Sequence, residues 1–365
     1  MDINIISCAN SSCGIGRYTN ELGIQLFEND HNVKVFRKDK PQPPIFQTYP
    51  YRSFKGLRHY IAPFFLSKAL SGIETQVWLA DYVDAAFALS LKKDNRDAII
   101  FTNVHDAIPF IFPTSKIAFE FYKTQLKNAV KISKKIIAVS EASKKDLVKY
   151  ADIDPDKIEV VYNGINHDFF YPDATKKVND VFTIRYVGGL SGPHKNAETL
   201  IEVAKILEQK GLNFRLEIGG GHPENTVLPS LVEKYNLKSV EFSGFIPDSD
   251  LRSFLAEADL FLYPSKYEGF GFPPLEAMAC GTATVSSNAG SLGEVLADGA
   301  LTSSPAPKDL ANEVEKIILS HSLKSEMEQK SASQAKKYSW EKSAHQHSEL
   351  FLKEVLKRNL GRASS

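Results

Sequence analysis

Short apolar runs alternate with amphipathic stretches along most of the chain. The run Ile3–Cys8 predicts a buried strand, and leucines four residues apart in Tyr18–Glu28 predict a helix that packs through one face. The succession restarts at Phe182–Val187, a predicted strand that precedes an amphipathic helix over Asn196–Gln209. Strands that alternate with helices are typical of parallel sheets covered by helices on both faces. We further expect strands at Val33–Phe36, Ala98–Thr102, Ile136–Val139, Ile158–Val161, Phe214–Ile218, Val240–Phe242, Leu260–Tyr263 and Ala283–Ser286, and helices at Tyr82–Leu91, Lys116–Lys135, Asp309–Ser320, Ser322–Lys337 and Trp340–Leu360.

The chain is long enough for two domains. Its 365 residues exceed the usual size of one hydrophobic core. The polar stretch Pro172–Asp180 interrupts the pattern and is the expected linker. The predicted fold class is therefore α/β, with two doubly wound, Rossmann-like domains. The expected boundaries are an N-terminal domain over 1–172, a second domain over 173–340, and a final helix and tail over 341–365.

Charge and cysteine content exclude several classes of function. Lys and Arg together number 44, as do Asp and Glu, so no overall field favours nucleic acid as a partner. Cys8, Cys13 and Cys280 lack the spacing of a zinc site or a disulfide framework. The N-terminus lacks the basic region of a signal peptide, and no later run is long enough to span a membrane. We expect a cytoplasmic protein.

Two segments raise the possibility of contact with a membrane surface. Aromatic and basic residues interleave over 49–60, a composition that suits a lipid headgroup region or a glycan acceptor as well as an ordinary surface loop. Lysines recur at helical spacing on two predicted helices, which suits either an anionic membrane face or a solvated helix face. These lysines are Lys116, Lys123, Lys127, Lys131, Lys134, Lys135, Lys144, Lys145 and Lys149.

The clearest chemical pattern is Glu268-Gly-Phe-Gly-Phe-Pro-Pro-Leu-Glu276. Pro273 and Pro274 lack donors that a first helical turn cannot use internally, so a helix is expected to begin there, with Glu276 in its first turn. Gly269 and Gly271 let the backbone turn its N–H groups toward an anion. The two glutamates suit the paired hydroxyls of a sugar or a ribose. A glycine turn followed by a helix-start glutamate is the plainer explanation.

This segment resembles the donor-site signature of the retaining family 4 glycosyltransferases, which have the GT-B fold. The glycine- and glutamate-containing junctions over 277–294 continue the likeness. The resemblance implies two domains facing a central cleft, and a final helix that crosses back to the first domain. It also implies that Glu268 holds sugar hydroxyls, that Glu276 holds the ribose, and that Gly269, Phe270 and Gly271 border the donor.

A glycine loop followed by a lysine is a second candidate for the donor site. Gly188 and Gly189 end a predicted strand, and Lys195 precedes a helix whose N–H groups could meet a diphosphate. An ordinary strand-to-helix turn with a surface lysine would look the same. In the resembling family an arginine usually follows the first glycine, and this chain has Gly189 there. Lys195 alone, or with Arg17, would then neutralise the leaving group.

Further candidates lie at other strand ends. His105 follows the strand Ala98–Thr102, where ligands bind in open α/β sheets, although it could instead hydrogen-bond within its own loop. Mannosyltransferase-like members of the family have a His-Asp pair at this point, which places His105 against the donor sugar. The family likeness also places Gly16 and Arg17 at the cleft and Phe245 and Ile246 against the nucleotide base.

The sequence leaves the identity of the donor and several functions open. The D-x-D matches at Asp152, Asp154 and Asp248 fit turns and a helix cap, so no catalytic metal and no cofactor is expected. The predicted partners are a nucleotide-sugar donor, GDP-mannose in preference to a UDP-sugar, and a glycan or lipid-linked acceptor. The alternatives are a GT-B sugar-nucleotide epimerase, a non-catalytic binding subunit of a glycan-assembly complex, and a dehydrogenase. The dehydrogenase is the weakest, since Gly14-x-Gly16-x-x-Thr19 lacks the third glycine of a dinucleotide fingerprint.

Overall fold

The computed structural model describes residues 1–10, 13–39, 44–49, 58–92, 98–173 and 179–363. Contacts divide the chain into two compact units. Unit 1 combines Met1–Gly164 with Trp340–Ser365, and unit 2 is the continuous segment Ile165–Ser339. The change from unit 1 to unit 2 falls at Gly164, before the stretch 172–180 that the sequence favoured as a linker; residues 174–178 of that stretch lie outside the described residues.

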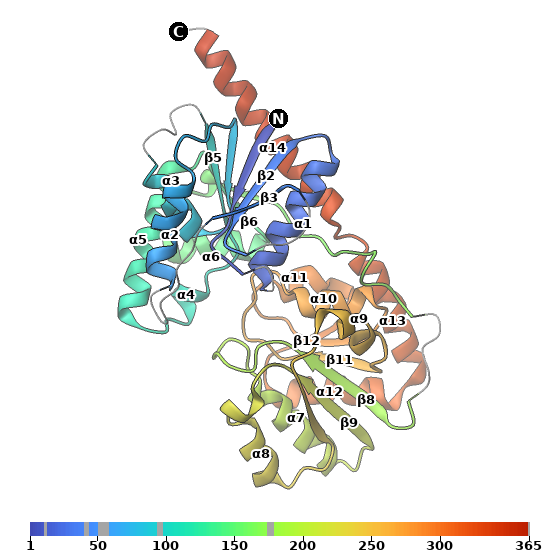
Figure 1. Ribbon diagram of the computed structural model, residues 1–365. Helices are drawn as coiled ribbons and strands as arrows, with labels where there is room; N and C mark the ends of the chain where they lie inside the picture. Colours follow the sequence, from blue (N-terminus) through green and yellow to red (C-terminus); the bar gives the residue numbers. More distant parts are fainter. Residues whose placement is uncertain (11–12, 40–43, 50–57, 93–97, 174–178, 364–365) are drawn as a thin grey trace. The chain divides into compact units, whose positions relative to one another are not determined.

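Unit 1 is built on a parallel sheet whose described strands have the order β3-β2-β1-β4-β5-β6-β7. Helices α2, α3 and α5 pack on one face of this sheet, and α1 and α14 lie side by side on the other (Figure 1). The elements are β1 (Asp2–Ile6), α1 (Gly14–Glu28), β2 (Asn32–Arg37), β3 (Phe46–Thr48), α2 (Arg58–Ala69), β4 (Val77–Ala80), α3 (Val83–Ser90), β5 (Ile99–Val104), α4 (Ile108–Ile111), α5 (Lys116–Ile132), β6 (Lys135–Ala138), α6 (Glu141–Ala151), β7 (Ile158–Val160) and α14 (Trp340–Ala363), with a 3₁₀ turn at Pro155–Lys157.

The last helix is part of the core of unit 1. Phe351 of α14 is fully buried against Phe101 of β5, with ring centroids 4.6 Å apart. His347, also fully buried, lies 3.0 Å from the Tyr18 hydroxyl of α1. Residues of the two ends of the chain therefore share one hydrophobic face of the sheet.

Unit 2 repeats the architecture with the strand order β10-β9-β8-β11-β12-β13, again with parallel pairing. Helices α7, α8 and α12 lie on one face of the sheet, and α9, α10 and α13 lie on the other (Figure 1). The elements are β8 (Phe182–Val187), α7 (Glu198–Gln209), β9 (Phe214–Gly219), α8 (Leu228–Tyr235), β10 (Val240–Gly244), α9 (Asp248–Ala256), β11 (Leu260–Tyr263), α10 (Phe272–Ala279), β12 (Thr284–Ser287), α11 (Leu292–Leu296), β13 (Leu301–Ser303), α12 (Pro307–Leu319) and α13 (His321–Ala335), with 3₁₀ turns at Pro223–Asn225 and Ala297–Gly299.

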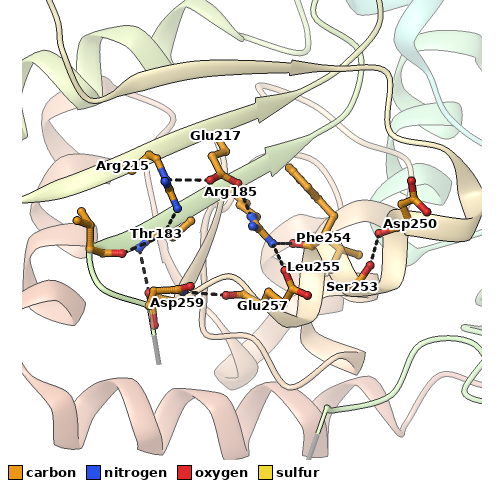
Figure 2. Close-up of polar contacts among 12 residues, drawn as sticks. Thr183, Arg185, Arg215, Glu217, Asp250, Ser253, Phe254, Leu255, Glu257 and Asp259 are labelled. Carbon is orange, nitrogen blue, oxygen red and sulfur yellow. Dashed lines mark hydrogen bonds and ion pairs between the residues drawn. The ribbon is translucent and has the colours of Figure 1, made fainter. Parts of the chain in front are cut away.

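A charged network ties neighbouring strands of unit 2 to the end of α9. Arg185 of β8 pairs with Glu217 of β9 (Nε to Oε2 2.6 Å), and its NH1 donates to the Phe254 carbonyl at 2.7 Å (Figure 2). Arg215 pairs with the other oxygen of Glu217 at 2.9 Å. Asp259 accepts from the Thr183 backbone N–H at 2.9 Å and fixes the turn into β11. These contacts hold the ends of the strands opposite to those that carry the candidate site.

The α/β fold class is confirmed, and several local expectations are wrong. Helix α1 begins at Gly14, so Gly16 and Arg17 lie in its first turn and not in a loop before it. Asp248 is the first residue of α9, and the N-cap is Pro247. Ser140 is the N-cap of α6, since its Oγ accepts from the Ser143 N–H at 3.0 Å. β3, α2 and β4 were not predicted from the sequence, and the stretch 49–60 lies largely outside the described residues.

Candidate active site

Glu268 occupies the loop after β11 and is almost completely buried, with 8% of its surface exposed. Its Oε1 accepts hydrogen bonds from the Tyr263 hydroxyl at 2.9 Å and the Ser265 hydroxyl at 2.8 Å. Burial, followed by the charge of Glu268, raises the pKa of Tyr263 well above its usual value, so the phenol stays protonated and keeps donating. The carboxylate is therefore held in one orientation by hydroxyl donors.

Lys195 supplies the positive charge beside this carboxylate. Its Nζ lies 2.9 Å from Glu268 Oε1 and 3.2 Å from Oε2. The loop of Lys195 is anchored by Asn196, whose side-chain amide donates to the carbonyls of Pro264 at 2.9 Å and Pro305 at 3.2 Å. The structure thus brings together two predicted site residues from the ends of β8 and β11, which are neighbours in the sheet. A charge-assisted contact of this length fixes both side chains.

The two glycines before Lys195 differ in what the structure demands of them. A Cβ on Gly188 would lie 2.8 Å from the Tyr186 hydroxyl, which donates to the Gly189 carbonyl at 2.8 Å. A Cβ on Gly189 would lie 3.7 Å from Lys195 Cγ, an ordinary contact distance. Packing therefore requires glycine at 188 and leaves room for a side chain at 189.

The loop that leads into α10 is fixed from two directions. Gly271, the N-cap of α10, has a left-handed backbone with φ of +92°, and a Cβ there would lie 2.6 Å from Leu292. Gly290 approaches the backbone of Glu268 so closely that a Cβ would be 2.7 Å from its carbonyl oxygen. That carbonyl also accepts from Ser291, at 3.1 Å from the N–H and 3.0 Å from Oγ. Gly271, which was predicted to let the chain approach a ligand, and Gly290, which was not, thus both let neighbouring segments of the protein pack closely.

Glu276 is buried in α10, with 3% of its surface exposed. It is the fifth residue of the helix and so lies beyond the first turn. The prediction from the sequence that Glu276 lies in the first turn is therefore wrong. Phe270 and Gly269, in the loop before this helix, are buried as well. The expected site for an anion thus combines a glycine loop with a short helix that begins at Phe272 and carries Glu276 inside its second turn.

Two predicted base contacts lie on the loop after β10. Phe245 is 73% exposed, which leaves its ring accessible to a ligand. Ile246 is half-buried, and a Cβ on Gly219 would lie 2.8 Å from its Cγ1. Ile246 therefore packs against the end of β9 while Phe245 projects into solvent.

His105 of unit 1 follows β5, where the sequence placed it. Its Nε2 lies 3.0 Å from the Asp81 carbonyl, and its ring meets Tyr18 edge-on at 4.9 Å. Burial lowers the pKa of His105 to about 4, so the imidazole is neutral near pH 7. Asp81, at the end of β4, was missed by sequence reasoning. Burial, and secondarily the charge of Asp84, raise the pKa of its carboxyl to about 7.

Comparison with known families assigns both units. Residues 169–338 match the family described as Glycosyl transferases group 1, and residues 13–169 match the one described as Glycosyltransferase Family 4. The chain belongs to family 4 of the glycosyltransferases. The family resemblance carried by Glu268 and Glu276 is thereby confirmed, whereas their individual roles stay predictions.

Two curated relatives of this glycosyltransferase family member are mannosyltransferases by name. The serotype-specific mannosyltransferase WbdA of Escherichia coli is 28% identical over 279 residues, which is 71% of this chain and 34% of WbdA. The chain therefore spans about a third of the length of that relative. The O-antigen chain mannosyltransferase B of Escherichia coli is 28% identical over 353 residues, which is 90% of this chain and 93% of that protein.

Solved structures support the GT-B fold. Sucrose-phosphate synthase from Thermosynechococcus elongatus has a TM-score of 0.83 at 20% identity, with 97% of this chain and 99% of that chain covered. HepE of Anabaena, solved in complex with UDP and glucose, has a TM-score of 0.79 at 18% identity, with 97% and 100% covered. In the described part of the chain, we find no helix with the length and apolar character needed to cross a membrane.

Proposed function

We propose that this glycosyltransferase family member moves a hexose from a nucleotide diphosphate sugar to a glycan or lipid-linked acceptor during the assembly of a cell-surface polysaccharide or glycoconjugate. The names of WbdA and mannosyltransferase B favour mannose, and therefore GDP-mannose as the donor. HepE, which was solved with UDP and glucose, supports a UDP-sugar as the alternative. The proposed enzyme works in the cytoplasm, with peripheral contact with the membrane face where a lipid-linked acceptor is presented.

The pair formed by Lys195 and Glu268 carries the proposal. A nucleotide diphosphate gains negative charge as it leaves, and a fixed cation at its oxygens stabilises that charge. Lys195 is held in place by Glu268 before any substrate arrives, so little reorganisation is needed. A carboxylate has about four lone-pair sites, and Glu268 Oε2 can accept a sugar hydroxyl in addition to Lys195. The same pair can therefore bind both groups, with Lys195 at the leaving group and Glu268 at the sugar.

The proposed reaction retains the anomeric configuration and needs no metal ion. The bond between the anomeric carbon and the diphosphate oxygen breaks, and its electron pair passes to the diphosphate. The acceptor hydroxyl oxygen attacks the same face of the sugar, and its proton passes to an oxygen of the departing phosphate. Positive charge from Lys195 would serve where other enzymes use a metal cation.

The remaining predicted residues have supporting roles in this proposal. His105, neutral near pH 7, would orient a sugar hydroxyl. Glu276 would accept hydrogen bonds from the ribose, and the exposed ring of Phe245 would stack on the base beside Ile246. The rest of the donor contacts would come from the backbones of Gly188, Gly189, Gly269, Phe270 and Gly271 and from Gly16 and Arg17 at the start of α1.

The test is release of GDP or UDP from a panel of nucleotide sugars, for wild type, Lys195→Ala and Glu276→Ala. Removing one preorganised charge from a site that stabilises a leaving group costs about 10²–10³ in rate. We expect a loss of that order for Lys195→Ala and unchanged release for Lys205→Ala. Lys205 is a matched control because it lies on α7 and pairs with Glu202 at 3.8 Å.

Each alternative function predicts a different result in the same experiment. A nucleotide that raises the melting temperature without any donor cleavage, with every acceptor tried, would favour the non-catalytic binding subunit. Isomerised sugar nucleotide in the absence of acceptor would favour the epimerase. If no nucleotide is released and none stabilises the protein, the donor site built on Glu268 and Glu276 is wrong.

A further inference from the structure

Unit 1 contains a cavity of about 700 Å³ that none of the predicted site residues lines. It lies at the carboxyl ends of β1 and β4, since Cys8, Ala9 and Asn10 follow β1 while Tyr82 and Asp84 follow β4. In the sheet, β2 and β3 lie on one side of β1, whereas β4 and the later strands lie on the other side. Such a switch in strand order is where open α/β sheets bind ligands. The cavity also has the volume of a small-molecule site.

The cavity wall is predominantly apolar. Most of its surface comes from aliphatic and aromatic side chains of α1, α4, α5 and the segment between the last two. Buried hydroxyl groups of a sugar would each need a hydrogen-bond partner, and an unmatched polar group is costly to bury. An alkyl or isoprenoid chain has no such requirement. The main apolar contributors are Ile15, Ile108, Phe112, Ala118, Phe119 and Phe121.

Buried polar residues such as Asp84 and Tyr122 also line this wall, and Gln125 is the one that indicates an oxygen on the ligand. Gln125 of α5 is 95% buried, with 5% of its surface exposed, and its Nε2 has no hydrogen-bond partner in the described structure. An amide donor that is buried without a hydrogen-bond partner destabilises the protein. A ligand oxygen that accepts from Nε2 would remove that cost.

We propose that this cavity holds the apolar chain of a lipid-linked acceptor, with Gln125 donating to an oxygen at the linkage between chain and sugar. The inference rests on the proposed glycosyltransferase function and narrows its acceptor to a saccharide carried on an alkyl or isoprenoid group. Ligand binding in the cavity does not depend on turnover, so it can be tested separately from the chemistry.

Cys13 provides a built-in reporter of occupancy. It lines the cavity and is the exposed member of the three cysteines, all of which are described. Burial raises the pKa of the Cys8 thiol well above its usual value and that of Cys280 to about 12, so neither forms the reactive thiolate readily. N-ethylmaleimide should therefore modify Cys13 first, and a ligand in the cavity should slow that reaction.

The first experiment measures the rate of Cys13 alkylation with farnesyl monophosphate, inorganic phosphate or methyl mannoside as the added probe. At a probe concentration about ten times its dissociation constant, the rate should fall about tenfold, because only about a tenth of the cavities remain empty. We expect protection by farnesyl monophosphate alone. Ala118→Leu, which fills the cavity from a half-buried position, should abolish it. Thr124→Leu, which adds a leucine to an exposed position of the same helix, should preserve it.

Other patterns of protection overturn the proposal. Protection by methyl mannoside equal to that by farnesyl monophosphate would assign the cavity to a sugar ring. Protection by inorganic phosphate would assign it to an anion. Absence of protection, or protection that persists in Ala118→Leu, would show that the apolar chain does not occupy the cavity.

The second experiment measures sugar transfer to a series of alkyl glycosides of increasing chain length. Each methylene that enters the cavity should lower KM about fourfold, which corresponds to ~0.8 kcal/mol per buried CH₂. The trend should disappear in Ala118→Leu. Transfer with a KM independent of chain length would leave the proposed function intact and refute the cavity assignment. Protection of Cys13 without cleavage of any donor would support the cavity assignment and refute the proposed function.

Discussion

Gly271 offers the sharpest test of how the candidate donor loop is held. Its φ of +92° is in the left-handed region, and a Cβ would meet the fully buried Leu292 at 2.6 Å. An L-residue in this region costs about 1–2 kcal/mol, and overpacking a close-packed site costs about 1–3 kcal/mol. Alanine also stabilises by reducing the entropy of the unfolded chain, by about 0.4–1 kcal/mol. We therefore expect Gly271→Ala to destabilise unit 2 by about 2–4 kcal/mol.

Two other glycines separate the contributions to this effect. Gly211 has a φ of +72° and nothing within 4 Å of its Cβ position, so Gly211→Ala measures backbone strain without a clash. Gly189→Ala introduces neither, since its Cβ would make ordinary contacts. The expected order of destabilisation is Gly271→Ala, then Gly211→Ala, then Gly189→Ala.

Urea unfolding can follow the two units by different signals. Both tryptophans of the chain, Trp78 and Trp340, belong to unit 1, so their fluorescence reports that unit, whereas far-UV circular dichroism reports both. Gly271→Ala should lower the midpoint of the circular dichroism transition. If Gly271→Ala proves no less stable than Gly211→Ala, the contact with Leu292 does not constrain the loop and the reasoning is wrong.

Three further changes have expected outcomes. Gly189→Arg should leave the free energy of unfolding in urea within about 0.5 kcal/mol of wild type, because position 189 is exposed and has room for a Cβ. It should raise the rate of nucleotide release by adding a cation beside Lys195, and slower release would contradict the proposed donor site. Burial lowers the pKa of His347 to about 4, below its unfolded value of about 6.5. The contribution of the neutral imidazole to the free energy of unfolding is therefore present above about pH 6.5 and is lost as pH falls toward 4. Between about pH 7 and pH 4.5, wild type should lose about 2 kcal/mol more stability than His347→Gln, measured by tryptophan fluorescence in urea, and equal losses would refute the assignment. Arg185→Met should destabilise unit 2 by about 3 kcal/mol, because it leaves the partly buried Glu217 with one partner, and an unchanged circular dichroism midpoint would show that the network contributes nothing.

The parts of the fold that could be predicted from the sequence are those with a clear local pattern. The strands at Phe182–Val187 and Leu260–Tyr263 have the predicted bounds, since both are apolar runs between turn residues. The strand Val77–Ala80 was missed, because four residues buried on both faces show no alternation that distinguishes them from a loop or helix segment. The helix Arg58–Ala69 contains Pro63, which argues against a helix locally.

The candidate site was predictable as a set of residues and less so as an arrangement. Lys195 and Glu268 were both selected from their motifs, and their contact depends on β8 and β11 being neighbours in the sheet. The positions of Tyr263 and Ser265 around Glu268, and of Gly290 against its backbone, depend on tertiary packing that no local motif encodes. Asp81 gave no signal in the sequence, because its significance comes from burial beside Asp84.

The insertion of unit 2 between two segments of unit 1 sets the order in which the chain can complete its folding during synthesis. Ile165–Ser339 is continuous, so unit 2 can finish once that segment has left the ribosome. Unit 1 must wait for α14, and translation at roughly 5–20 residues per second makes this delay on the order of ten seconds or more. Until then, the surfaces of Tyr18 and Phe101 that pack against Trp340 and Phe351 stay uncovered. We therefore expect this uncovered apolar surface to be a binding site for a chaperone during synthesis.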